Sequence, residues 1–387
     1  MNAPSSSVEL LSMTELSPIA ESSSMNEMEF PFALQHIQKI LVIGPAWIGD
    51  MMMAQTLFKL LKLRNPRVRI DVLASGWTRQ LLACMPEVHQ VIDMPLGHGK
   101  FGLGERRALG KSLADQGYEQ AIVLPNSFKS AFVPFFANIP LRTGWRGELR
   151  YGLLNDVRVL DKKRYPLMVQ RYAALALPKS AAPLQEFPFP ELQVDKSHHP
   201  QLLTKFALQL NRPLLIICPG AEYGPAKRWP EHYFAEVVDE KIRSGWQVWL
   251  MGSAKDHPVA DAIRNLLLDD DRAHCYNLAG GTSLGEAIEL MACADAVLSN
   301  DSGLMHIAAA LQKPLAVIYG STSPEHTPPL TKQVSIISNK IECSPCFERE
   351  CPKVHHKCLR ELMPQQVLTA LNALIAQPAM VTMVNPG

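Results

Sequence analysis

From Lys39 onward, the chain alternates short apolar runs with stretches whose apolar residues recur at helical spacing. Four runs in the first part predict strands: "KILVIG", "VRIDVLAS", "HQVIDM" and "QAIVLPN". The stretches between them, such as "MMMAQTLFKLLK" and "RRALGKSLADQG", predict helices. This alternation is typical of βαβ units, in which helices cover a parallel sheet.

The alternation stops once, at "KSAAPLQEFPFPELQ", which is rich in Pro and Ala and has no periodicity. We place a linker there, at residues 181–195. Beyond it, the buried apolar runs "PLLIICPG", "WQVWLMGS", "HCYNLAG", "DAVLSN" and "PLAVIYG" predict a second parallel sheet. Helical patterns separate these runs at residues 230–244, 257–268, 283–294 and 302–311.

The pattern therefore predicts an α/β protein with two Rossmann-like, doubly wound domains, residues 39–180 and 196–362, that face a common cleft. Ligands of such sheets bind beyond the carboxyl ends of the strands. Residues 363–387 hold a last helix and a tail, and this helix could pack back against the first domain.

Residues 1–38 differ from the rest: they contain no Lys or Arg, five Glu and eight Ser. The basic start and apolar middle of a secretory signal are missing, so we expect a disordered tail, or extra sequence upstream of a start at Met25 or Met28. This suggests a cytoplasmic protein whose eight Cys are reduced. The net charge of +1 gives no general attraction to nucleic acid.

The first strand-end loop, "GPAWIGD", has the glycine spacing of a phosphate-binding loop, but Asp50 stands where that loop needs Lys. One interpretation is a helix N-cap, which stabilises by ~1 kcal/mol. The other is a general base that the helix dipole keeps ionised. One carboxylate can do both.

Two loops of the second domain are suited to an anion. In "CPGAEYGPAKRWP", Lys227 precedes a helix N-terminus, where backbone N–H groups are free, so it is a candidate phosphate ligand. In "LSNDSGLMHIAAAL", the residues Asp301, Ser302, Gly303 and His306 gather at one strand end. Each alone fits a cap or a structural residue; together they favour a site.

A further loop, "MGSAKDHPVADAI", follows the second strand of the second domain. An acidic residue at this place often accepts hydrogen bonds from ribose hydroxyls. Asp256 fits that role and equally fits a plain helix start. In this scheme the second domain binds a nucleotide, and the first supplies a carboxylate across the cleft.

The chain resembles the heptosyltransferases of lipopolysaccharide core assembly (glycosyltransferase family 9), which have the two-Rossmann GT-B fold. The resemblance covers nearly all of the chain from Lys39 onward. It rests on "GPAWIGDMMMAQ", "LPNSFKSAFVPFFANIPLRTGWRGELRYGLLND", "PGAEYGPAKRWP", "SNDSGLMHIAAAL", "STSPEHTPPL" and "CSPCFERECP".

The resemblance implies an inverting transfer of heptose from ADP-heptose to the first heptose of the inner core, without a cofactor. It implies that Asp50 deprotonates the acceptor hydroxyl, that Lys227 neutralises the leaving diphosphate, and that Asp301 holds the donor heptose. The remaining donor-binding residues that it implies are Ser302, Gly303 and His306 beside the phosphates, Asp256 at the ribose, Thr282 near the adenine, and Glu222 and Tyr223.

The implied acceptor is an anionic glycolipid, heptosyl-Kdo lipid A. Between Arg142 and Arg171 there are eight Lys or Arg against three Asp or Glu. Lys129 and Arg142, which we place after strand ends, and Arg146 are candidate acceptor ligands; a solvated basic surface is the alternative. Such a surface would also favour loose attachment to the inner face of the inner membrane.

"CSPCFERECPKVHHKC" gathers four Cys and two His in one short segment. This density suggests zinc, but the spacing matches no well-known zinc motif, so we favour reduced structural cysteines and expect no catalytic metal. The alternatives left open for the function are a heptosyltransferase of type I or III with another acceptor, and a non-catalytic protein that binds nucleotide sugars. A binding protein would have no use for a base at position 50.

Overall fold

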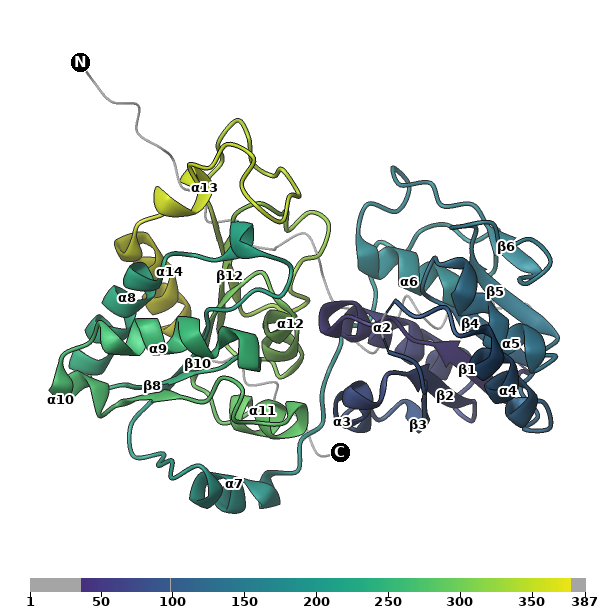
Figure 1. Ribbon diagram of the computed structural model, residues 1–387, viewed down its shortest axis with the longest axis horizontal. Coiled ribbons are helices and arrows are strands. Elements are labelled where there is room, and N and C mark those ends of the chain that lie inside the picture. Colours follow the sequence, from purple (N-terminus) through teal and green to yellow (C-terminus); the bar gives the residue numbers. More distant parts are fainter. Residues whose placement is uncertain (1–35, 98, 377–387) are drawn as a thin grey trace, which may run out of the picture.

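The computed structural model describes residues 36–97 and 99–376, and Figure 1 shows them as two α/β halves placed side by side. The first half contains a six-stranded parallel sheet with the order β3-β2-β1-β4-β5-β6. Its strands are β1 (Lys39–Ile43), β2 (Arg69–Ala74), β3 (Val88–Asp93), β4 (Gln120–Val123), β5 (Leu141–Trp145) and β6 (Asp156–Arg158).

The second half repeats this topology in a parallel sheet with the order β12-β11-β10-β7-β8-β9. Its strands are β7 (Leu214–Cys218), β8 (Gln247–Leu250), β9 (Cys275–Asn277), β10 (Ala296–Asn300), β11 (Leu315–Tyr319) and β12 (Val334–Ser338). Each sheet reverses its strand order beside its first strand, β1 or β7. The loops at these two points are where a ligand is expected. The predicted fold class is confirmed.

Helices cover both sheets. Those of the first half are α2 (Ile48–Arg64), α3 (Arg79–Ala83), α4 (Leu103–Leu113), α5 (Phe132–Phe136) and α6 (Met168–Ala176). Those of the second half are α7 (His199–Lys205), α8 (Glu231–Arg243), α9 (His257–Asn265), α10 (Asp269–Arg272), α11 (Leu284–Met291), α12 (Gly303–Ala310), α13 (Lys357–Arg360) and α14 (Pro364–Ala376). Short 3-10 turns are η1 (Gly76–Thr78), η2 (Phe128–Ala131), η3 (Lys196–His198), η4 (Pro225–Lys227) and η5 (Ala254–Asp256).

Helix α2 joins the two halves. It is buried over most of its length because it packs on α6 of its own half and on α12 of the other. A helix surrounded in this way is apolar on all sides, which the run Met51–Ala54 satisfies. Gln55 of α2 also holds the segment between the halves: its amide donates to Glu191 O (2.6 Å) and accepts from Glu191 N (3.0 Å).

The structure differs from the sequence-based expectation at two places: the packing of the last helix and the number of strands at the sheet edges. The last helix, α14, packs on α8, β11 and β12 of the second half and not on the first, because Val367, Leu368 and Leu371 complete the apolar core on that face of the second sheet. Strands β5, β6 and β12 were not predicted, since "LRTGW", "DVR" and "VSIIS" mix polar and apolar residues.

Most of the tail assigned to residues 1–38 lies outside the described residues. The same holds for residues 377–387, the end of the segment predicted at 363–387. Within the described part of the chain, no helix has the length and apolar character needed to cross a membrane.

Candidate active site

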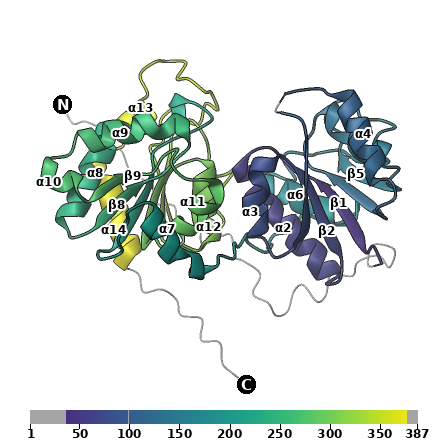
Figure 2. The ribbon, with the colours of Figure 1, turned by 60° about the horizontal axis from the view of Figure 1, so that its bottom comes forward.

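The two halves meet through the N-terminal ends of α2 and α12. A Cβ atom at Gly49 would lie 2.7 Å from Cδ2 of the His306 ring, and one at Gly303 would lie 2.9 Å from Cβ of Ile48. Both distances are too short for any side chain, so glycine is required at both positions for this approach. Figure 2 shows the neighbouring helices α3 and α11, which are also in contact, on the facing sides of the halves.

Asp50 lies in the first turn of α2, three residues after the N-cap position, which Trp47 occupies. The cap interpretation of Asp50 is therefore wrong. Burial raises the pKa of its carboxyl group, while a hydrogen bond from Tyr172 and the charge of Lys227 act in the opposite direction. The charge of Lys227, in the second half, thus lowers the pKa of Asp50, in the first half.

Tyr172 is a site residue that the sequence did not reveal. It lies on α6, is buried, and its hydroxyl acts on the Asp50 carboxyl group, whose pKa it lowers. Burial and the nearby carboxylate raise its own pKa well above the usual value, so the hydroxyl keeps its proton. The helical pattern of "VQRYAALA" marks Tyr172 only as a core residue; its partner is set by the packing of α6 on α2.

Lys227 lies in η4, after β7, and its Nζ is 2.6 Å from Oδ2 of Asp301, which follows β10. The ion pair is largely removed from solvent, with side-chain exposures of 13% and 5%. The hydroxyl of Thr322 donates to the same carboxylate oxygen. Asp301 therefore fixes the position of Lys227 in this structure, and Thr322, from the quoted "STSPEHTPPL", is a further residue whose role the sequence did not indicate.

The aromatic ring of Tyr223 lies against the ammonium group of Lys227. Lys227 Nζ is 4.9 Å from the ring centre, and the guanidinium carbon of Arg349 lies 5.4 Å from it. Glu222, next to it, is exposed and paired with Lys255. The two predicted donor-binding residues thus differ in position: Tyr223 contacts Lys227, while Glu222 faces solvent.

His306 is fully enclosed between the halves, and burial lowers its pKa to about 4, with Lys227 acting in the same direction and Asp301 against it. The imidazole is therefore neutral near pH 7. Ser302 occupies the N-cap of α12, where its hydroxyl lies 3.3 Å from that of Ser299. The start of α12 lies at the contact between the halves and follows Asp301, the partner of Lys227; the first N–H groups of a helix have no partner within it.

Asp256 ends η5 and accepts hydrogen bonds from the backbone and hydroxyl of Ser253, both at 2.8 Å. Its carboxylate packs against Gly220 and Gly252, at the ends of β7 and β8. Asp256 is thus held at the carboxyl edge of the second sheet. Thr282 lies half-buried just before α11.

The predicted acceptor residues separate into two groups. Arg142 does not follow a strand: it is the second residue of the strand β5, which ends at Trp145, and it donates to the carbonyls of Ile139 and Leu153, both at 2.6 Å. The predicted placement of Arg142 after a strand end is therefore wrong, because this strand was not recognised in the sequence. Lys129 and Arg146 do follow β4 and β5, respectively, at the cleft edge of the sheet.

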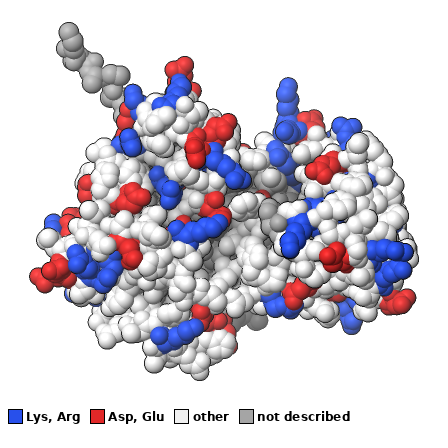
Figure 3. All heavy atoms as spheres, viewed as in Figure 1, with Lys and Arg blue, Asp and Glu red and all other residues white. Residues whose placement is uncertain are grey.

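The basic excess between Arg142 and Arg171 is in large part internal. Arg150 and Arg158 are buried, and five of the eight cations donate to backbone carbonyls: Arg142, Arg150, Arg158, Arg164 and Arg171. Figure 3 shows the exposed basic side chains, with several along the margins of the hollow between the halves.

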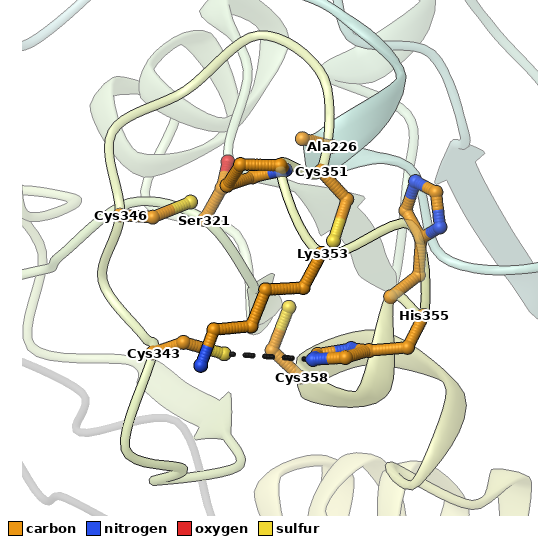
Figure 4. Close-up of a pocket in the computed structure, with 10 residues that line it drawn as sticks. Ala226, Ser321, Cys343, Cys346, Cys351, Lys353, His355 and Cys358 are labelled. Atoms are coloured by element: carbon orange, nitrogen blue, oxygen red, sulfur yellow. Dashed lines mark hydrogen bonds between the residues drawn. The ribbon is translucent and has the colours of Figure 1, made fainter.

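The four-Cys segment, residues 343–358, packs against the loop that carries Lys227. Its thiols point toward a common small cavity (Figure 4) that Ala226 and Ser321, the neighbours of Lys227 and Thr322, also line. Burial and the other three thiols raise the pKa of Cys358 to about 11. Among residues 36–97 and 99–376, no three His, Cys, Asp or Glu side chains are arranged to hold a metal ion.

Hydrogen bonds connect this segment to the loop in front of it. Ala226 N donates to Arg349 O at 3.0 Å, and the hydroxyl of Tyr223 donates to Phe347 O at 2.5 Å. The segment Cys343–Cys358 therefore supports the loop that presents Lys227.

The two Rossmann-like sheets, with Asp50 on one side of the cleft and Lys227 on the other, have the arrangement of the GT-B fold. The family model described as "Glycosyltransferase family 9 (heptosyltransferase)" matches residues 106–357, and the chain belongs to this family. It is an enzyme that transfers a sugar.

The chain is similar to lipopolysaccharide heptosyltransferase 2 of Escherichia coli K12, with 51% identity over 88% of this chain and 99% of the relative. Lipooligosaccharide heptosyltransferase 2 of Haemophilus influenzae is 50% identical over 87% of this chain and 99% of its own. The solved structure of E. coli ADP-heptose LPS heptosyltransferase II superimposes with a TM-score of 0.80 at 49% identity, covering 87% of this chain and 98% of that chain. The resemblance read from the sequence is confirmed.

Proposed function

We propose that the enzyme transfers L-glycero-D-manno-heptose from ADP-heptose to the first heptose of the lipopolysaccharide inner core, with inversion at the anomeric carbon. The observation that carries this proposal is that Asp50 and Lys227 lie on opposite sides of the cleft. The chain is 51% identical to a lipopolysaccharide heptosyltransferase 2. Incubation with ADP-heptose and defined core acceptors, with products identified by mass spectrometry, tests it. Transfer only to an acceptor that lacks the first heptose would indicate a type I enzyme instead.

The chemistry follows from where charge develops. The acceptor hydroxyl attacks the anomeric carbon from the side opposite the diphosphate, and its proton passes to Asp50. The bond between the sugar and the phosphate oxygen breaks as ADP gains negative charge. Lys227 and the N–H groups at the start of α12 stabilise that charge. In this scheme Asp301 positions Lys227 and holds the donor heptose, while Ser302, Gly303 and His306 flank the phosphates.

We assign the nucleoside of the donor to Asp256, Thr282 and Tyr223, which lie at or near the carboxyl edge of the second sheet. Lys129 and Arg146 are our candidate ligands for anionic groups of the acceptor. Because that acceptor is anchored in a membrane, we place the enzyme in the cytoplasm, in transient contact with the inner face of the inner membrane.

Replacing Tyr172 by Phe should move the acidic limb of the kcat/KM profile to higher pH. The hydroxyl lowers the pKa of Asp50, and its loss leaves the raising effect of burial less opposed. We expect a shift of about one pH unit, worth ~1.4 kcal/mol, and recovery of most activity on the alkaline side. The buried Tyr165→Phe variant is the control. An unchanged profile would mean that the hydroxyl does not act on Asp50.

The reaction should survive EDTA, because Lys227 and the start of α12 supply the positive charge that a divalent ion would provide. The measurement is the initial rate after dialysis against the chelator. Loss of activity that Mg²⁺ or Mn²⁺ restores would contradict this account. Loss that only zinc restores would instead assign a structural metal to the four-Cys segment.

A further inference from the structure

Three loops at the carboxyl edge of the first sheet adjoin one another. Lys129 Nζ donates to Lys100 O at 3.3 Å, which links the loop after β4 to the segment before α4. Phe101 and Phe128 both contact the ring of Phe132, at 5.7 and 5.0 Å between centres.

The loop after β5 joins the same surface. The backbone of Phe128 donates to the Glu148 carboxylate at 2.6 Å, and Glu148 N donates to Asn126 O at 3.0 Å. The three loops therefore form one continuous surface at the side of the cleft that carries Asp50.

This surface exposes large apolar side chains. Leu149 is 78% exposed, Tyr151 62%, Phe101 50% and Phe128 36%. Single exposed apolar residues are ordinary, but four on loops that adjoin one another indicate an interaction site. We call these four side chains, with the neighbouring cations Lys100, Lys129 and Arg146, the apolar rim.

A buried arginine fixes the backbone that carries Leu149 and Tyr151. Arg150, between Leu149 and Tyr151, is 1% exposed and donates to Pro125 O (2.6 Å), to Trp145 O and to the hydroxyl of Ser130 (3.2 Å). A buried guanidinium that joins the loops after β4 and β5 fixes their backbone. Its two neighbours in the chain are thereby presented to solvent.

The charge of the rim identifies its partner. Three cations flank the apolar tips, while the Glu148 carboxylate is engaged by the backbone of Phe128. Aromatic and aliphatic tips beside Lys and Arg are the composition that enters the headgroup region of an anionic bilayer. Resting on the proposed function, which places the acceptor in a membrane, we propose that the apolar rim docks the enzyme on an anionic bilayer surface.

The test is sedimentation of the full chain with vesicles of phosphatidylethanolamine and phosphatidylglycerol, compared with phosphatidylcholine alone. We expect binding to the anionic vesicles that falls by about tenfold in the double variant Leu149→Ser, Tyr151→Ser, because two apolar tips are lost. The matched control is Leu266→Ser, Leu268→Ser, two side chains of the second half that are 57% and 65% exposed. Equal binding by the wild type and the rim variant, or no binding by either, would overturn the proposal.

Activity separates membrane docking from other uses of the rim. The rim variant should keep its kcat/KM on a delipidated core oligosaccharide and lose activity on the same acceptor presented in anionic vesicles. Equal loss on both substrates would show that the rim binds core sugars. A wild-type dimer in gel filtration that the rim variant converts to monomer would show a self-interface. Either result overturns docking. Vesicle binding that depends on the rim, without heptose transfer to any core acceptor, would refute the proposed function and retain the rim.

Discussion

Replacing Asp50 by Asn should lower kcat by about two to four powers of ten, the usual contribution of a general base. The amide has the size of the carboxylate and can still accept the hydrogen bond of Tyr172, so the fold and the affinity for ADP should be retained. Because an amide takes up no proton from the acceptor, raising the pH should not restore the rate. Steady-state kinetics from pH 6 to 9 and calorimetry with ADP provide the measurements.

The exposed Asp115→Asn variant of the same domain is the control and should behave as the wild type. Turnover near the normal value in Asp50→Asn would leave Asp50 as a structural residue of the first turn of α2. The proposed mechanism would then need a different base.

Replacing Lys227 by Ala should weaken both ADP binding and turnover. A charged hydrogen bond to phosphate contributes ~1.5–3 kcal/mol, so ADP affinity should fall by about ten- to 100-fold. Turnover should fall by about 10²–10³-fold, because the ammonium group acts most strongly as charge develops on the leaving diphosphate. Lys227 also lowers the pKa of Asp50, so the acidic limb should move to higher pH.

Among the described residues, the substitution leaves the Asp301 carboxylate, 5% exposed, with only the Thr322 hydroxyl as a side-chain partner, so a thermal melt must accompany the kinetics. Lys227→Arg, which keeps the charge, should retain more ADP affinity than the Ala variant, and Lys205→Ala on the surface of the same half should have no effect. If ADP affinity and rate are unchanged in a folded Lys227→Ala variant, the diphosphate binds elsewhere.

The sequence predicted those parts of the fold and site that depend on local pattern. Buried parallel strands are continuous apolar runs, and Asp50, Lys227 and Asp301 stand beside glycine turns at the ends of such runs, which is why their loops were identified. β5 is an exception, with Arg and Gly inside it, and the error at Arg142 follows directly from missing that strand.

The parts that the sequence did not predict depend on contacts between distant segments. Tyr172 has the periodicity of a core residue, and only the packing of α6 against α2 brings its hydroxyl to Asp50. Thr322 reaches Asp301 because β10 and β11 are neighbours in the sheet. Arg150 and Arg158 count as surface charge in a sequence, yet the carbonyls they bind become apparent only in the folded chain.

The contact between Gly49 and the ring of His306 sets the least distance to which the two halves can approach. In the proposed mechanism, the separation between the Asp50 side and the Lys227 side of the cleft therefore depends on this contact, and a larger residue at position 49 would hold the two halves further apart.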